Sequence, residues 1–100
     1  FVAAMEYLEK SLAFNLKSQN KKELARTYNN IGTVYEKQNQ LNKALDNLNK
    51  ALVLRKEIGD VDELIETHMA LGTTYGKLKQ DKKSTQHFAI ALEKATSANN

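Results

Sequence analysis

Apolar residues recur along this chain at the spacing of one helix face. From Leu24 to Tyr35 they follow one another in steps of four, three and four residues, which places them on the same side of an α-helix. Similar stripes run through the rest of the chain, and only a few residues separate one segment from the next, so neighbouring helices must lie antiparallel. The pattern predicts helices over residues 2–17, 22–38, 41–57, 61–78 and 81–97.

The chain also repeats itself with a period of 40 residues. Residues 21–60 align with residues 61–100, and the opening 1–20 fit the second half of that unit. The identities include Glu23/Glu63, Leu24/Leu64, Thr27/Thr67, Gly32/Gly72, Thr33/Thr73, Tyr35/Tyr75, Lys37/Lys77, Gln40/Gln80, Lys43/Lys83, Ala51/Ala91 and Leu52/Leu92. A fixed period of this size indicates a stack of supersecondary units, and such arrays typically offer extended surfaces for binding other chains.

Turn-forming residues mark the breaks between the predicted helices. The breaks are Ser18-Gln19-Asn20, Asn39-Gln40, Gly59-Asp60 and Lys79-Gln80-Asp81. Gly59 can adopt the left-handed conformation that ends a helix. Asp60 or Asp62 can then cap the following helix, because a carboxylate accepts hydrogen bonds from first-turn amides.

Two glycines, Gly32 and Gly72, lie inside predicted helices. Gly costs about 1 kcal/mol relative to Ala in a helix interior, so a packing gain must offset the cost. We expect a partner helix to approach closely at each missing side chain, with the small residues Ala44, Ala51 and Ala91 on its side. On this interpretation Gly32→Leu unfolds the repeat.

Composition narrows the classes of protein and partner. The absence of Pro and the presence of only 4 Gly favour long helices. The net charge of +3 is too mild to indicate nucleic-acid binding, and the basic doublets Lys21-Lys22 and Lys82-Lys83 stand at predicted helix starts. No apolar run approaches the roughly 20 residues of a membrane span, and early charges argue against a signal peptide. The absence of Cys excludes disulfides and thiolate metal sites and fits a reducing compartment.

The repeated unit resembles the tetratricopeptide repeat. That family shows a large aromatic, Leu-Gly and Tyr on its first helix, then Ala, an aromatic and Ala on its second. The two copies here read Tyr28, Ile31-Gly32, Tyr35, Ala44, Leu48, Ala51 and His68, Leu71-Gly72, Tyr75, Ser84, Phe88, Ala91. The resemblance covers essentially the whole chain and implies an all-α fold, an α-solenoid of antiparallel helix pairs. Five helices would make about two and a half repeats of one domain: 1–20 as the second helix of a truncated repeat, then 21–60 and 61–100.

Some positions depart from the family pattern. The usual proline after the second helix is replaced by Lys56 and Thr96, and Trp is replaced by Tyr28 and His68. The period is 40 residues, against about 34 in the family. The extra residues fall before His68 and would lengthen each flanking helix by about one turn. Longer repeats of this kind resemble those of bacterial peptide-sensing regulators, of kinase and cyclase sensor regions, and of kinesin light chains.

The resemblance implies a concave surface lined by the first helix of each repeat. The candidate groove residues are Arg26, Asn29, Asn30, Thr33, Glu36 and Lys37, followed by Glu66, Met69, Ala70, Thr73, Gly76 and Lys77. An amide both donates and accepts, so Asn29 and Asn30 suit capture of a peptide backbone. The alternative is that both are exposed amides without a role. Family members that clamp a terminal carboxylate carry Lys and Asn one turn apart in the first helix, whereas the corresponding residues here are Asn29 with Thr33 and Met69 with Thr73.

The sequence gives little support for an enzymatic function. His68 stands where the family packs an aromatic residue, so we expect a structural side chain, and His87 aligns with Asn47 on a face predicted to be solvated. Neither has a His, Asp or Glu at the i+4 spacing of a helical metal pair. We therefore expect no catalytic residue, no metal, no cofactor and no enzymatic activity.

The chain begins inside a second helix without Met or an N-cap, so we expect it to be part of a larger protein. The sequence favours a noncatalytic module that binds a protein or peptide within a cytoplasmic, bacterial signalling or regulatory protein, without nucleic-acid or membrane contact. An alternative is a structural spacer or dimerisation segment without a peptide ligand. The helix over 2–17 leaves Val2, Met5, Leu8 and Leu12 partly uncovered, which predicts self-association through the terminal helices.

Overall fold

The computed structural model describes residues 2–18 and 20–98; Phe1, Gln19, Asn99 and Asn100 lie outside that description. The described residues form the helices α1 (Val2–Ser18), α2 (Lys21–Lys37), α3 (Leu41–Ile58), α4 (Val61–Lys77) and α5 (Asp81–Ala98), and no strand. The predicted all-α fold is confirmed, and every predicted helix end lies within one residue of the observed one. Of the four predicted breaks, only the first includes an undescribed residue, Gln19.

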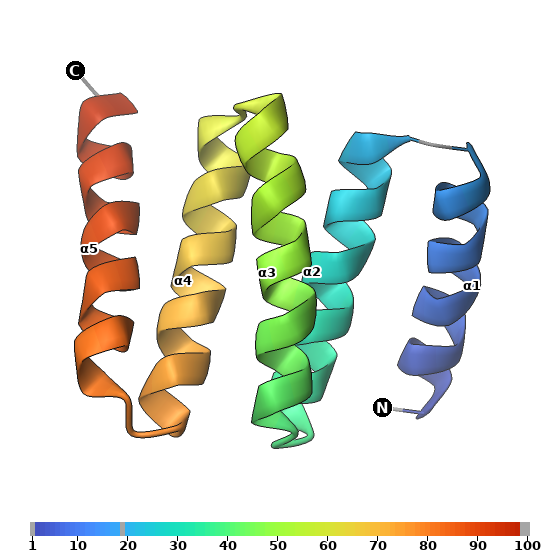
Figure 1. Cartoon of the computed structure of the whole chain (residues 1–100), viewed down its shortest axis with the longest axis horizontal. Coiled ribbons are helices and arrows are strands. Elements are labelled where there is room, and N and C mark those ends of the chain that lie inside the picture. The colour runs from blue at the N-terminus through green and yellow to red at the C-terminus, as the bar shows by residue number, and fades with distance from the viewer. Residues whose placement is uncertain (1, 19, 99–100) are drawn as a thin grey trace.

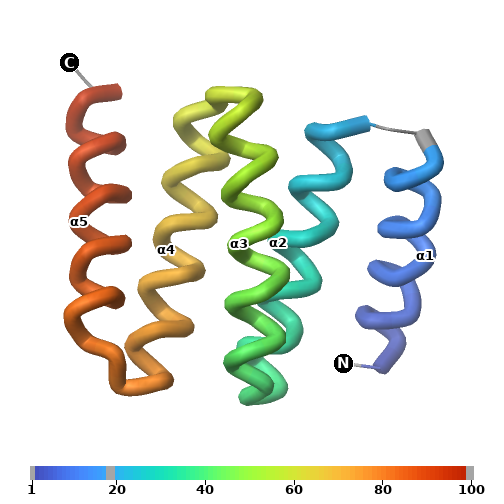
Figure 2. The backbone as a smooth tube through the Cα atoms, in the orientation of Figure 1, coloured from blue at the N-terminus to red at the C-terminus, as the bar shows by residue number. Residues whose placement is uncertain are grey.

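The helices run alternately up and down in chain order, from α1 at one edge to α5 at the other (Figure 1). The connections from α2 to α3, from α3 to α4 and from α4 to α5 appear in the backbone trace as tight bends at alternate ends (Figure 2). Each helix packs against its neighbours in the chain, and α2 also touches α4. The described residues span 36 × 30 × 17 Å, so this is a flat stack with two broad faces.

The helix ends repeat along with the sequence. The side-chain oxygen Oδ1 of Asn20 accepts from the Glu23 amide at 3.1 Å, and Oδ1 of Asp60 accepts from the Glu63 amide at 3.1 Å. Asp60, one of the two predicted caps, is therefore the residue that starts α4. Gly59 ends α3 with φ +82°, which confirms the predicted left-handed turn.

Both helix-interior glycines are buried against the next helix. A Cβ on Gly32 would lie 2.7 Å from Leu48 Cγ, and one on Gly72 would lie 2.9 Å from the Phe88 ring. The close approach is as predicted, but large side chains fill the space beside both glycines, and the nearest small residue to Gly32 is Ala44, through its backbone oxygen. Leu48 continues into the buried cluster with Leu52, Leu64 and Leu71.

Helix α1 buries little of its apolar surface. Leu8 is buried, whereas Met5 and Leu12 are half-buried and Val2 is exposed. Two aromatic side chains, Tyr7 and Phe14, are each 70% exposed. These rings lie seven residues apart and so share one face of α1, which makes that face the first place to look for a binding surface.

Candidate functional site

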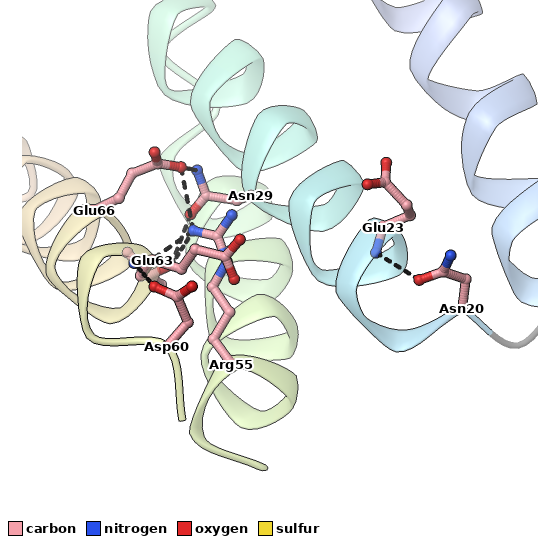
Figure 3. Close-up of polar contacts among 8 residues, drawn as sticks. Asn20, Glu23, Asn29, Arg55, Asp60, Glu63 and Glu66 are labelled. Atoms are coloured by element: carbon pink, nitrogen blue, oxygen red, sulfur yellow. Dashed lines mark hydrogen bonds and ion pairs between the residues drawn. The ribbon is translucent and has the colours of Figure 1, made fainter. Parts of the chain in front are cut away.

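The predicted groove residues do not form one continuous surface. Four of them join α2 to α4. The Asn29 amide donates to Glu66 Oε1 at 3.0 Å and accepts from the Thr67 hydroxyl at 2.9 Å (Figure 3). Lys77 forms an ion pair with Glu36. Since Asn29 is only 3% exposed, the expected surface amide is instead a buried link between two repeats.

Arg55 of α3 is the centre of this polar contact. Its guanidinium Nη1 lies 2.9 Å from the Thr67 hydroxyl, 3.1 Å from Glu66 Oε1 and 3.1 Å from the Glu63 carbonyl oxygen (Figure 3). Arg55 is 2% exposed, and a buried charge needs such partners because its desolvation is costly. Together with Asn29 these contacts fix how α2, α3 and α4 meet.

Three further candidates lie on the opposite flank of α2. Arg26, Asn30 and Lys37 are exposed, and Arg26 makes one ion pair, at 3.6 Å with Glu23 of its own helix. Within residues 2–18 and 20–98 the Asn30 side chain has no hydrogen-bond partner. Arg26 and Asn30 lie on the side of α2 that faces α1, unlike Asn29.

Arg26 and Asn30 contribute to a groove of about 500 Å³ between α1 and α2, hereafter the α1/α2 groove. Helix α1 supplies the exposed rings of Tyr7 and Phe14 together with Lys10. The full lining is Tyr7, Leu8, Lys10, Ser11, Phe14, Asn15, Asn20, Glu23, Arg26, Thr27 and Asn30. A wall of exposed aromatics facing charged and amide groups suits contact with another polypeptide, since aromatic and Arg side chains dominate binding interfaces.

The remaining candidates divide between two environments. The hydroxyls of Thr33 and Thr73 donate to the backbone carbonyls of Asn29 and Met69, at 3.0 and 3.1 Å, so their hydrogens point back along their own helices. The Met69 side chain, half-exposed, lines a second groove of about 230 Å³. That α4/α5 groove is lined by Ile65, Met69, Phe88, Ala91, Leu92 and Ala95.

The prediction from the sequence agrees with the structure for His68 but not for His87. His68 is buried, as its aromatic position indicates. The solvated orientation predicted for His87 is wrong: its Nδ1 lies 3.0 Å from His68 Nδ1, and its ring stacks on Tyr75 at 5.5 Å. At the equivalent position the shorter Asn47 donates to the backbone of its own helix, whereas an imidazole is long enough to reach across to α4.

Burial and neighbouring positive charge keep this histidine pair neutral at pH 7. Burial, then His87, Lys56 and Lys94, lowers the pKa of His68 to about 4. Burial and Lys56 also lower the pKa of His87. One Nδ1 must therefore donate to the other as a neutral hydrogen bond. The described residues contain no group of three His, Asp or Glu side chains placed to hold a metal ion.

A family model for the tetratricopeptide repeat matches residues 23–97. The chain belongs to this family. Neither the curated proteins nor the solved structures searched for similarity give a match. Tetratricopeptide repeats in general mediate protein–protein interactions. In the described part of the chain, none of the helices has the length and apolar character of a membrane span.

Within the tetratricopeptide repeat, the buried polar residues of the second helix were not predicted from the sequence. Arg55 lies three residues after Leu52 and seven after Leu48, so it falls within an apolar stripe. Asn15 occupies the same place in α1 and is also buried. The sequence did carry one signal for these residues, namely a charged or amide side chain within an otherwise apolar stripe. The hydrogen-bond partners of that side chain lie on the next helix.

Proposed function

We propose that the chain is a noncatalytic protein-binding module that takes a polypeptide segment into the α1/α2 groove. The observation that carries this proposal is the exposure of Tyr7 and Phe14 beside Arg26 and Asn30 on a concave surface of about 500 Å³. Exposed aromatic pairs of this kind gain most when a partner covers them. The noncatalytic part is supported by the family, whose repeats serve in general as interaction units.

The biological setting is a further part of the proposal. The module acts in the cytoplasm within a bacterial signalling or regulatory protein. Support comes from the 40-residue period, which resembles the repeats of bacterial peptide-sensing regulators. A binding experiment tests the groove directly, whereas it does not test the cellular setting.

The test compares peptide-array binding of four proteins: wild type, Asn30→Ala, the double variant Tyr7→Ala/Phe14→Ala, and the control Val53→Ala. Val53 is an exposed apolar residue of α3 outside the lining of the α1/α2 groove. We expect the double variant to lose most of the signal, Asn30→Ala to weaken it, and the control to match wild type. Equal signals from all four proteins would refute binding in this groove.

The alternative of a spacer or dimerisation segment has an observation of its own. The α4/α5 groove is lined only by apolar residues, and Leu92 is 69% exposed. An uncovered apolar end favours self-association. Sedimentation at low micromolar concentration should then show a dimer that Leu92→Lys converts to monomer. A wild-type protein that sediments only as a monomer excludes the dimerisation segment.

A further inference from the structure

One face of α5 combines positive charge with a stacked histidine. Four residues of α5 recur at the spacing of a single helix face, and they are Lys83, His87, Ile90 and Lys94. The His87 ring packs against both rings of α4, with its centroid 5.2 Å from that of His68 and 5.5 Å from that of Tyr75. The Lys83 ammonium lies 5.4 Å from the centroid of the Tyr75 ring. This face of α5 is therefore turned toward α4.

Helix α3 adds a lysine from the other side of α4. Helix α4 lies between α3 and α5, and no described residue of α3 contacts α5 (Figure 1). Burial, then His87, Lys56 and Lys94, lowers the pKa of His68 to about 4. Charges shift a pKa in this way over short distances, so an ammonium group of α3 and one of α5 both lie near the same ring. Lys56, Lys83, Ile90 and Lys94 are hereafter the α3/α5 surface.

The lysines of the α3/α5 surface have no acidic partner. Among the residues that the structure describes, Lys56, Lys83 and Lys94 form no ion pair with a carboxylate. Lys56 and Lys83 are exposed and Lys94 is half-buried. A lysine of this kind buries its stem and keeps its ammonium group in water. All three charges are therefore accessible to a ligand of opposite charge.

The repeat itself does not require these charges. At the corresponding positions one period earlier, Leu16 stands for Lys56 and Leu54 stands for Lys94. The same helices thus form with apolar residues at both places. The two lysines are a feature of this one junction between repeats, which favours a role beyond folding.

A neighbouring repeat would leave the α3/α5 surface uncovered. Stacked as α4 stacks on α3, it would contact the α4/α5 groove. Three residues of that groove, Phe88, Leu92 and Ala95, correspond to the residues of α3 that contact α4. None of them belongs to the charged face of α5, so access to that face depends only on α3, α4 and α5.

We propose that the α3/α5 surface is a second interaction surface, apart from the α1/α2 groove, and that it binds an acidic segment of another polypeptide. Lys83 and Lys94 lie about three turns apart on α5, roughly 16 Å, which an extended segment of about five residues spans. The carboxylates of the segment pair with the three ammonium groups. An apolar side chain of the segment covers Ile90, which is 36% exposed.

A polypeptide fits this surface better than a single-stranded nucleic acid does. Surfaces that bind single strands combine basic residues with aromatic rings on which the bases stack. Here Tyr75 and the two imidazoles already stack on one another. Each exposed ion pair contributes little, so the segment needs several carboxylates at once, and we expect weak, rapidly exchanging binding.

The test is an NMR titration of the whole isotope-labelled chain with hexaglutamate and, separately, with hexaglutamine. Amide shifts should change around Lys56, His87 and Lys94 with hexaglutamate alone. They should disappear when the ionic strength is raised to about 1 M, where the Debye length is about 3 Å. Bound carboxylates also offset the two lysines that act on His68, so its pKa should rise from about 4.

The variant Lys56→Gln/Lys94→Gln should weaken binding of hexaglutamate about fivefold, the loss of two exposed ion pairs. The matched control is Lys17→Gln/Lys22→Gln, which removes the same charge from exposed positions of α1 and α2 and should bind as wild type does. Circular dichroism checks the fold of both variants. Without peptide, the pKa of His68 should rise in the first variant and stay unchanged in the control.

Three results would overturn the proposal. Equal weakening in the two variants indicates attraction by net charge alone. Hexaglutamate that shifts no amide of α3 or α5 shows that the surface does not bind acids. A uridine hexanucleotide that binds there more tightly than hexaglutamate assigns the surface to nucleic acid in place of a polypeptide.

Discussion

Replacing Gly32 with Ala tests how tightly α2 packs on α3. An added Cβ would lie 2.7 Å from Leu48 Cγ, 2.9 Å from its Cδ2 and 3.2 Å from the backbone oxygen of Ala44. Leu48 is fully buried and cannot turn into solvent. Overpacking costs about 1–3 kcal/mol, and Ala regains about 1 kcal/mol of helix propensity. The net loss should be about 0–2 kcal/mol, and Gly32→Leu, with a whole isobutyl group, should abolish cooperative unfolding.

A double-mutant cycle with Leu48→Ala identifies the cause. Leu48→Ala alone should cost about 2–5 kcal/mol, as for other buried leucines. In that background the atoms nearest to the added Cβ are gone, so Gly32→Ala should stabilise by up to about 1 kcal/mol. The assay is urea unfolding followed by circular dichroism, with the slope compared among variants to confirm two-state behaviour. An equal cost of Gly32→Ala in both backgrounds would falsify the packing explanation.

Three further predictions concern the polar contacts and one turn. Arg55→Ala should cost about 3–5 kcal/mol in urea unfolding, because it leaves buried polar partners unpaired, and Arg55→Met should cost less because it fills the space; equal losses contradict this account. His68 should titrate near its lowered pKa of about 4 by NMR, and the unfolded state then binds protons first, so stability falls between pH 6.5 and 4 by up to about 3 kcal/mol. His68→Tyr should remove most of that acid sensitivity, and an unchanged pH profile counts against it. Gly59→Ala should cost about 1 kcal/mol because φ is +82°, Gly59→Asn should cost less, and no loss in either variant would contradict the turn geometry.

The fold could be predicted because its determinants are local. The helices begin and end where the apolar spacing and the short polar breaks indicate, and Gly59 marks the end of one of them. Because the sequence repeats, the apolar spacing and the polar breaks occur in two copies. The packing of Gly32 was also predictable in kind, since a helix-interior glycine needs compensation. The residue that fills the space beside Gly32 was not predictable. Leu48 and Ala44 lie one turn apart on the same stripe, so helical periodicity does not distinguish between them.

The polar side chains were harder to predict because their partners lie on other helices. Asn29 and Asn30 are adjacent amides in sequence, yet one is buried against α4 and the other is exposed. A rotation of about 100° per residue separates them, and only the position of the neighbouring repeat decides which one is covered. His87 shows the same limitation, since side-chain length determined whether it reaches His68. Whether the twelve candidate groove residues bind a ligand stays a prediction.

Helix α1 contacts α2 and no other described helix, so its packing depends on the contact with α2 alone. Local opening of α1 then leaves α4 and α5 undisturbed, and its amides should exchange with deuterium sooner than those around Leu71. A guest that touches α1 and α2 together would slow that exchange. The edge of the molecule that is easiest to detach thus becomes the part whose order reports occupancy.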